Sequence, residues 1–580
     1  MKQFPSQPDP QNPLKSHQTP PYTTYHPKIK PLLRRFYREN QLNETNYQRS
    51  LKMNSNTFRA VNTNTNKSRG PSSHYIKGYA KDLKAQNSLS KLSYSFNSSL
   101  VFENAYLFSK IRGLRNLTSL DVQFFINRRP IPLKVLFKSL AYLKDLTHFK
   151  LELNFYGFTD TDGQTLQVLF QSLQRLEKLK SLSLCFLMCS NFKKAKMNNL
   201  PQYLRHLKQL QSLELSFDRS RELTDRDMIS LVSVFPKLPL LTQISLDFGG
   251  QRRIIEGSTL IQMFQYIRNL SGIAFGLGSS EVMKTESTDP LSEGLRLLHA
   301  PSLKKLNLHL SQNLDTQSFI ELTQTIKRFS SLNILQLSLF GCETLTNDGA
   351  VELGSALSCL TMLSSFNLRV HHSIEADSVV GCIASGLKSS HNLLNLKLNF
   401  ANIKTDPDQI QQLSASLANL NSLKFLDLSF SSVQSLSTDV LQKLGESLLE
   451  LGQLKHLVLD FGYAKTVTNQ GVEAITNAIQ ELHDLSFLDL NFVANEEIDE
   501  KAVDKIAETL RHLPSLYTSQ IRFSRCPKLQ QKERSFSSLF NALREMKNIR
   551  EVFLAVSFNE INEQEVNDLK KRKTVTAHWF

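Results

Sequence analysis

The chain has 580 residues and is strongly basic, with 69 Lys and Arg against 53 Asp and Glu and a formal net charge of +16. No segment approaches the roughly 18 consecutive apolar residues that a membrane-spanning helix requires, and the first residues lack the apolar core of a secretion signal. We therefore expect a protein of the cytoplasm or nucleus that does not enter the membrane.

The first 75 residues are expected to form a disordered basic tail. Residues 1–100 hold 16 Lys and Arg against 4 Asp and Glu, and they are rich in Pro, Asn, Ser, Thr and Gln. This composition cannot bury enough apolar surface to fold alone. The most basic part of this tail could contact phosphates, an acidic partner or a nuclear import receptor. The alternative is a solvated arm without function. The cations in this part are Lys28, Lys30, Arg34, Arg35 and Arg38.

Residues 76–112 are expected to lead into the folded part of the chain. A short helix fits within residues 76–92, and residues 93–112 carry the apolar side chains Phe102, Leu107 and Ile111. We expect these to cap the first unit of the repeating domain that follows.

Residues 113–565 contain a phrase of the form Leu-x-x-Leu-x-Leu-x-Phe about every 31 residues, fifteen times in all. Internal repetition of this length is the signature of a solenoid, and it replaces the several separate domains that length alone suggests. The first residues of the phrases are Leu117, Leu146, Leu179, Leu210, Leu241, Leu270, Leu303, Leu332, Leu363, Leu393, Leu423, Leu454, Leu485, Leu516 and Ile549.

Each repeat is predicted to form a half-buried strand followed by a helix. Counted from the first residue, positions 4, 6 and 8 are apolar and are expected to face inward, while positions 3, 5 and 7 face outward. Helix-start residues follow the strand, as at Thr224, Thr346, Thr468 and Asp499. One such unit cannot bury its apolar face alone, but a stack of units can.

Position 11 provides an independent check of the register. Ten of its fifteen residues are Asn, Cys or Ser, although this position was not used to align the repeats. A small polar side chain here can bond backbone groups of the neighbouring repeat that would otherwise be buried unpaired.

These features resemble leucine-rich-repeat proteins of the ribonuclease-inhibitor-like subclass, in which an Asn or Cys column follows the strand. The repeat of about 31 residues also resembles those of large ciliate leucine-rich-repeat families. The column usually falls at position 9, so position 11 implies a strand about two residues longer. The resemblance implies an α/β solenoid, a curved horseshoe with a parallel sheet on the concave face and helices on the convex face, of about 15 repeats. The subclass includes inhibitors, GTPase activators and scaffolds.

One part of the expected concave face stands out in the last five repeats. Outward positions on three successive strands combine aromatic rings with carboxylates, which suits a protein partner with basic side chains. The alternative is that the rings only cover the strands and the acids are solvated. The candidate binding residues are Phe425, Asp427, His456, Asp460, Phe487, Asp489 and Asn491.

The remaining features of the sequence mostly argue against particular functions. The outward positions hold five basic and eight acidic residues, so nucleic acid is expected to bind only through the N-terminal tail. No glycine-rich loop, metal-ligand spacing or nucleophile with a base is found, so we expect no enzyme activity, cofactor or metal. The six cysteines fit a reducing compartment.

The C-terminal residues 566–580 are expected to form a basic tail, in which Lys570–Lys573 has the form of a nuclear-localisation signal. The sequence thus favours a monomeric protein-interaction scaffold or adaptor. The alternatives are a nucleic-acid-associated protein that uses the basic tail, and a regulator of a small GTPase.

Overall fold

A computed structural model divides the chain into two compact units, Met1–Asn54 and Ser55–Phe580. The first unit lies outside the described residues, so the basic cluster from Lys28 to Arg38 has no structural account. The structure describes residues 57–61, 89–96, 108–127, 133–156, 164–187, 199–217, 223–249, 254–278, 281–282, 289–311, 314–340, 345–371, 377–529, 535–556, 569 and 574–578.

The second unit contains an 18-stranded sheet in which every pair of neighbouring strands is parallel. Fifteen of these strands each begin two residues after a predicted first residue, so the whole register is confirmed. They are β3 (Ser119–Asn127), β4 (His148–Tyr156), β5 (Ser181–Leu187), β6 (Ser212–Ser216), β7 (Gln243–Asp247), β9 (Gly272–Gly278), β11 (Lys305–Ser311), β12 (Ile334–Phe340), β13 (Ser365–His371), β14 (Asn395–Asn399), β15 (Phe425–Ser429), β16 (His456–Asp460), β17 (Phe487–Asn491), β18 (Thr518–Arg522) and β19 (Glu551–Ala555).

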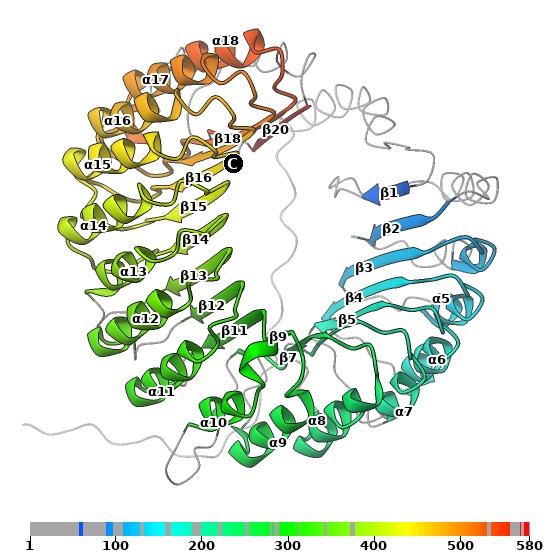
Figure 1. The fold of residues 1–580 in the computed structure, drawn as a ribbon. Coiled ribbons are helices and arrows are strands. Elements are labelled where there is room, and N and C mark those ends of the chain that lie inside the picture. Colours follow the sequence, from blue (N-terminus) through cyan, green and yellow to red (C-terminus); the bar gives the residue numbers. More distant parts are fainter. Residues whose placement is uncertain are drawn as a thin grey trace, which may run out of the picture. The chain divides into compact units, whose positions relative to one another are not determined.

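One helix lies between each pair of successive repeat strands, and Figure 1 shows the helices together on the outer side of the sheet. This is the predicted leucine-rich-repeat α/β solenoid. The helices are α5 (Leu133–Leu140), α6 (Gln164–Leu173), α7 (Leu200–Leu204), α8 (Asp225–Val232), α9 (Gly257–Ile267), α10 (Pro290–Arg296), α11 (Thr316–Lys327), α12 (Asn347–Cys359), α13 (Val379–Leu387), α14 (Pro407–Leu417), α15 (Thr438–Leu449), α16 (Asn469–Ile479), α17 (Glu500–Arg511) and α18 (Ser537–Glu545).

The predicted helix-start residues cap these helices. Thr224 forms a reciprocal capping box with Asp227 at the start of α8. Thr346 and Thr468 accept hydrogen bonds from backbone N–H groups of the first turns of α12 and α16, and Asp499 does so for α17. Each cap satisfies a donor that the helix leaves unpaired.

Three further strands extend the sheet where the sequence predicted a tail or a cap. Strand β1 (Thr57–Val61) lies within the expected disordered tail and pairs with β2 (Lys91–Phe96), which overlaps the expected helix and cap. Strand β20 (Thr574–His578) lies within the expected C-terminal tail and pairs with β19. The edge of an open sheet offers unpaired backbone groups to a short strand without requiring leucine spacing. These three segments are strands of the sheet, and β2 pairs with the first predicted repeat strand, β3.

The predicted longer strand occurs in only part of the sheet. Strands β3 and β4 have nine residues and β5, β9 and β11–β13 have seven, whereas β6, β7 and β14–β19 have five. In the shorter strands the residue at position 8 lies beyond the strand but stays buried, as for Phe430 at 0% exposure. In these repeats the additional apolar residue at position 8 therefore adds to the core without lengthening the strand.

Phenylalanines at position 8 form the centre of the core. Phe186 and Phe217 lie with ring centroids 5.9 Å apart, and Phe217 and Phe248 lie 6.0 Å apart. Near the C-terminus, Phe492 and Phe523 stack at 5.6 Å. Rings at this distance contribute roughly 0.5–1.5 kcal/mol beyond the area that they bury. Where neighbouring repeats both carry Phe at position 8, each ring thus packs against the ring of the next repeat.

Two described polar side chains at position 11, Asn495 and Cys526, bond the preceding repeat, as the sequence suggested. Asn495 Nδ2 donates to the backbone carbonyl of Phe461 at 3.0 Å, and Cys526 Sγ donates to that of Phe492 at 3.1 Å. The residue just before, at position 10, has a positive φ in five successive repeats, from Asn402 to Arg525. This left-handed residue turns the chain out of the strand and brings position 11 inward.

We expect Asn495→Ala to lower the free energy of unfolding by about 1–2 kcal/mol. The backbone carbonyl of Phe461 would lose the hydrogen bond from Asn495 Nδ2, the shorter of the two that it accepts. Denaturant unfolding of the full chain measures this. Asn392 donates a similar bond to Thr361 O at an exposed site, so Asn392→Ala is the matched control, with a cost below about 0.5 kcal/mol. Equal losses in the two variants would contradict a structural role for the column.

Candidate protein-binding surface

The outward face of the sheet carries the predicted side chains. In β14, β16 and β18 the residues at positions 4 and 6 are buried, while those at positions 3, 5 and 7 are half-buried or exposed. All seven candidate residues occupy positions 3, 5 or 7 of β15, β16 and β17. The structure therefore brings them onto one face of β15, β16 and β17. Figure 1 labels β15 and β16, and β17 pairs with β16 and β18.

Three of the candidates form a continuous stack, which we call the aromatic row: Phe425, His456 and Phe487. They are register partners at position 3 of adjacent strands. The ring centroid of His456 lies 5.9 Å from that of Phe425 and 5.6 Å from that of Phe487, with nearly parallel planes. His456 is exposed and both phenylalanines are half-buried. The row is thus held by its own stacking and still presents aromatic surface to solvent.

The carboxylates of Asp427 and Asp489 are engaged by neighbouring strands. Lys397, the register partner of Asp427 on β14, forms an ion pair with it. Arg522 on β18 donates two bonds to Asp489, at 2.8 and 2.9 Å. The aspartates are only 8% and 7% exposed. They lie on the predicted face but are covered by their cationic partners.

Burial governs the acidity of Asp489. Desolvation raises the pKa of this carboxyl above its usual value, and the nearby carboxylates Asp460 and Asp427 raise it further. The charge and hydrogen bonds of Arg522 act in the opposite direction. Without Arg522, ionised Asp489 would stand in a poorly solvated site with no compensating charge.

Asp460 and Asn491 serve the ends of their strands. Asp460 accepts bonds from Asn491 Nδ2 at 2.7 Å, from Ser429 Oγ at 3.0 Å and from the backbone N–H of Gly462 at 3.0 Å. Asn491 Oδ1 accepts from the backbone N–H of Val493 at 3.1 Å. These two side chains stabilise the turn that leaves the sheet.

The three acids therefore do not form the freely accessible acidic surface that the sequence suggested. Each of them already has a donor within the solenoid, and two have a full cationic partner. What remains accessible is the aromatic row, together with the half-buried side chains of Val458, Asp460 and Asn491. The surface is more apolar than its sequence implied.

A second acidic group lies on the first repeats, at Asp121, Glu152, Glu214 and Asp247. Burial raises the pKa of Glu152, while Lys150, 4.0 Å away, lowers it less. Ser183 Oγ donates to Glu214 at 2.7 Å, and Ser216 Oγ donates to Asp247 at 3.1 Å. These acids are also partly satisfied within the sheet.

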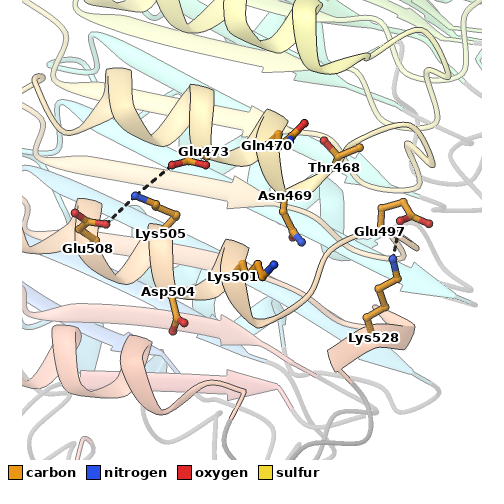
Figure 2. A pocket seen from close by; sticks show the side chains of 10 residues that line it. All are labelled: Thr468, Asn469, Gln470, Glu473, Glu497, Lys501, Asp504, Lys505, Glu508 and Lys528. Carbon is orange, nitrogen blue, oxygen red and sulfur yellow. Dashed lines mark hydrogen bonds and ion pairs between the residues drawn. The ribbon is translucent and has the colours of Figure 1, made fainter.

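The helical side has a hollow of about 660 Å³ that no sequence motif indicated. Figure 2 shows Lys505 of α17 between Glu473 and Glu508, at 3.3 and 3.2 Å, and Lys528 paired with Glu497 at 2.6 Å. Its charges of both signs largely neutralise one another. None of the predicted site residues lines it.

Within the described ranges, no group of three or more His, Cys, Asp or Glu is placed to hold a metal ion. No helix among these residues is long and apolar enough to cross a membrane. Cys185 and Cys526 are free and buried, and burial raises the pKa of both thiols to about 11. Neither thiol has the acidity of an activated nucleophile.

No protein-family model matches this sequence, and no curated protein matches it either. The chain is similar to a solved structure described as the Rad7 and Elc1 complex in yeast, with a TM-score of 0.36 and 17% identity. The match covers 65% of this chain and 91% of that chain. Similarity at this level carries no functional argument, and the fold assignment rests on the repeats themselves.

We expect Arg522→Met to lower the free energy of unfolding by about 2 kcal/mol at neutral pH, because it leaves Asp489 buried without its cation. The raised pKa of Asp489 means that the folded state binds a proton more tightly than the unfolded state. The loss should therefore be small below the usual carboxyl pKa and should grow as pH rises through the raised value. Denaturant unfolding at about pH 3.5 and about pH 7.5 measures the difference.

The control for this variant is Lys528→Met, which breaks the exposed pair with Glu497. It should cost less than about 0.5 kcal/mol at either pH. A loss for Arg522→Met that does not depend on pH would show that Asp489 is not the group left uncompensated.

Proposed function

We propose that this protein is a non-enzymatic scaffold or adaptor that binds a protein partner through the aromatic row. The observation that supports the proposal is the stack of Phe425, His456 and Phe487, which remains accessible on an otherwise polar sheet face. Aromatic side chains at such positions are the usual anchors of protein interfaces.

The rigidity of the row favours binding. Adjacent strands hold the three rings at fixed spacing, and backbone hydrogen bonds such as Phe425 N to Leu394 O at 3.0 Å fix each strand start. Little side-chain freedom is lost when a partner binds, so more of the contact energy appears as affinity. A standard interface of about 1,600 Å² in total is within the reach of a few repeats.

The partner suggested by this surface carries an apolar or aromatic anchor. The acids that the sequence offered for a basic partner are engaged by Lys397 and Arg522. The exposed charges directly before the row are Lys424 and Lys455. We therefore propose an anchor residue flanked by neutral or acidic side chains, in place of a purely basic segment.

We also infer that the repeats are of the ribonuclease-inhibitor-like subclass. The support is the polar column, which bonds the preceding repeat at Asn495 and Cys526, together with α-helices of up to 13 residues, as in α12. Nucleic-acid binding through the N-terminal tail and regulation of a small GTPase stay predictions from the sequence.

We expect the double variant Phe425→Ala/Phe487→Ala to lose at least one specific partner, with affinity lowered by about 2 kcal/mol or more, because it removes both outer anchors of the row. Quantitative affinity capture from the native cells, followed by a binding titration of each captured protein, measures the effect.

The matched control is Val351→Ala/Leu449→Ala, which removes two exposed apolar side chains from the helical side. Every partner should bind this control and the unmodified chain equally well. If the aromatic-row variant keeps all partners at full affinity, the proposed interface is wrong.

A further inference from the structure

A second charged surface lies along one edge of the sheet, where each helix turns into the next strand. We define the basic edge as the seven-residue turn segments of the first eight repeats, each from five residues before the first leucine to one residue after it. These segments are residues 112–118, 141–147, 174–180, 205–211, 236–242, 265–271, 298–304 and 327–333.

The basic edge has a marked charge excess. Its eight segments hold thirteen Lys and Arg, with at least one in every segment, against only Asp145 and Glu177. Cations such as Arg115, Lys180 and Arg268 are exposed. Lys178 is neutralised by Asp145 at 2.6 Å, but Arg115, Lys180 and Arg268 make no ion pair with a described residue.

The turns form a regular row because backbone bonds join each one to the next. The position-2 N–H of one repeat donates to the position-2 carbonyl of the preceding repeat, as Lys180 N does to Thr147 O at 2.8 Å and Lys304 N does to Ser271 O at 2.7 Å. With a strand spacing of about 4.8 Å, seven steps span about 34 Å. That length corresponds to about ten base pairs of duplex DNA at 3.4 Å each.

Helix capping alone does not explain this excess. Cations at helix C-termini stabilise the helix dipole by about 0.3–1 kcal/mol, and all the repeat helices end at this edge. The equivalent turns of the last seven repeats follow helices of the same kind, yet they hold seven Lys and Arg against four acids, and two of them contain no cation. The excess is specific to the first eight repeats.

From these observations we infer that the basic edge binds the phosphate backbone of a nucleic acid. A row of cations at regular spacing, about half of them arginines, matches a linear polymer of phosphates. Only three large apolar side chains are exposed in or beside these described turns, namely Tyr142, Leu240 and Leu297. Insertion into a membrane would need a larger apolar surface. This site is independent of the aromatic row and of the N-terminal tail.

The test compares two variants of the full chain that each remove four charges. The edge variant is Arg115→Gln/Lys180→Gln/Arg268→Gln/Lys304→Gln. The control is Lys388→Gln/Lys424→Gln/Lys455→Gln/Lys547→Gln, which changes the equivalent turns of the last repeats. Both variants keep the N-terminal tail, so any contribution from the tail is the same in each. All eight side chains are exposed on these turns.

Binding of a labelled duplex of about 20 base pairs is measured over a range of salt concentrations. We expect the edge variant to bind at least about tenfold more weakly, with a salt slope lower by about three to four, since each lost phosphate contact removes about 0.9. The smaller variant Arg115→Gln/Arg268→Gln should lower the slope by about half as much, and the control should leave it unchanged.

The inference is overturned if the unmodified chain does not bind the duplex, or if the edge variant and the control lose affinity equally. It is also overturned if the edge variant loses binding to anionic phosphatidylserine vesicles or to polyglutamate while its duplex binding is unchanged. Thermal melting of each variant, matched to that of the unmodified chain, shows that the fold is intact.

Discussion

The stacking of each repeat on its neighbour is the constraint on which the rest of the structure depends. A single strand and helix leave the residue at position 8 uncovered, and only the next repeat covers it. Phe461 stacks on Phe492 at 5.8 Å, and Phe492 stacks on Phe523 at 5.6 Å. The column at position 11 adds hydrogen bonds between the same repeats. Stability therefore grows along one dimension, as is usual for solenoids.

The same stacking decides what the outward face presents. In a parallel sheet that is in register, equal positions of successive repeats lie side by side, so equal charges there would repel one another. At position 5 the order is Lys397, Asp427, Val458 and Asp489, which pairs one acid with a base and separates the two acids by an apolar residue. At position 3 the same geometry produces the aromatic row.

Much of the fold was predictable from the sequence because a strand and a helix recur with a nearly constant period. All fifteen repeat strands begin at the expected residue. Strands β1 and β20 were not predictable from the repeat, since edge pairing uses backbone groups and requires no leucine motif. Strand β2 was predictable, because Leu89, Leu92, Tyr94 and Phe96 repeat the motif 28 residues before Leu117. For the site, the sequence placed Asp427 and Asp489 on the outward face, but its period of two does not reveal the burial that Lys397 and Arg522 cause from neighbouring strands.

The most direct test of the central claim is hydrogen exchange of the full chain, alone and with a bound partner. Binding to the aromatic row should slow exchange in residues 425–429, 456–460 and 487–491 and in the turns beside them, while helices α15, α16 and α17 keep their rates. Protection confined to those helices, with unchanged exchange in the three strands, would contradict the account.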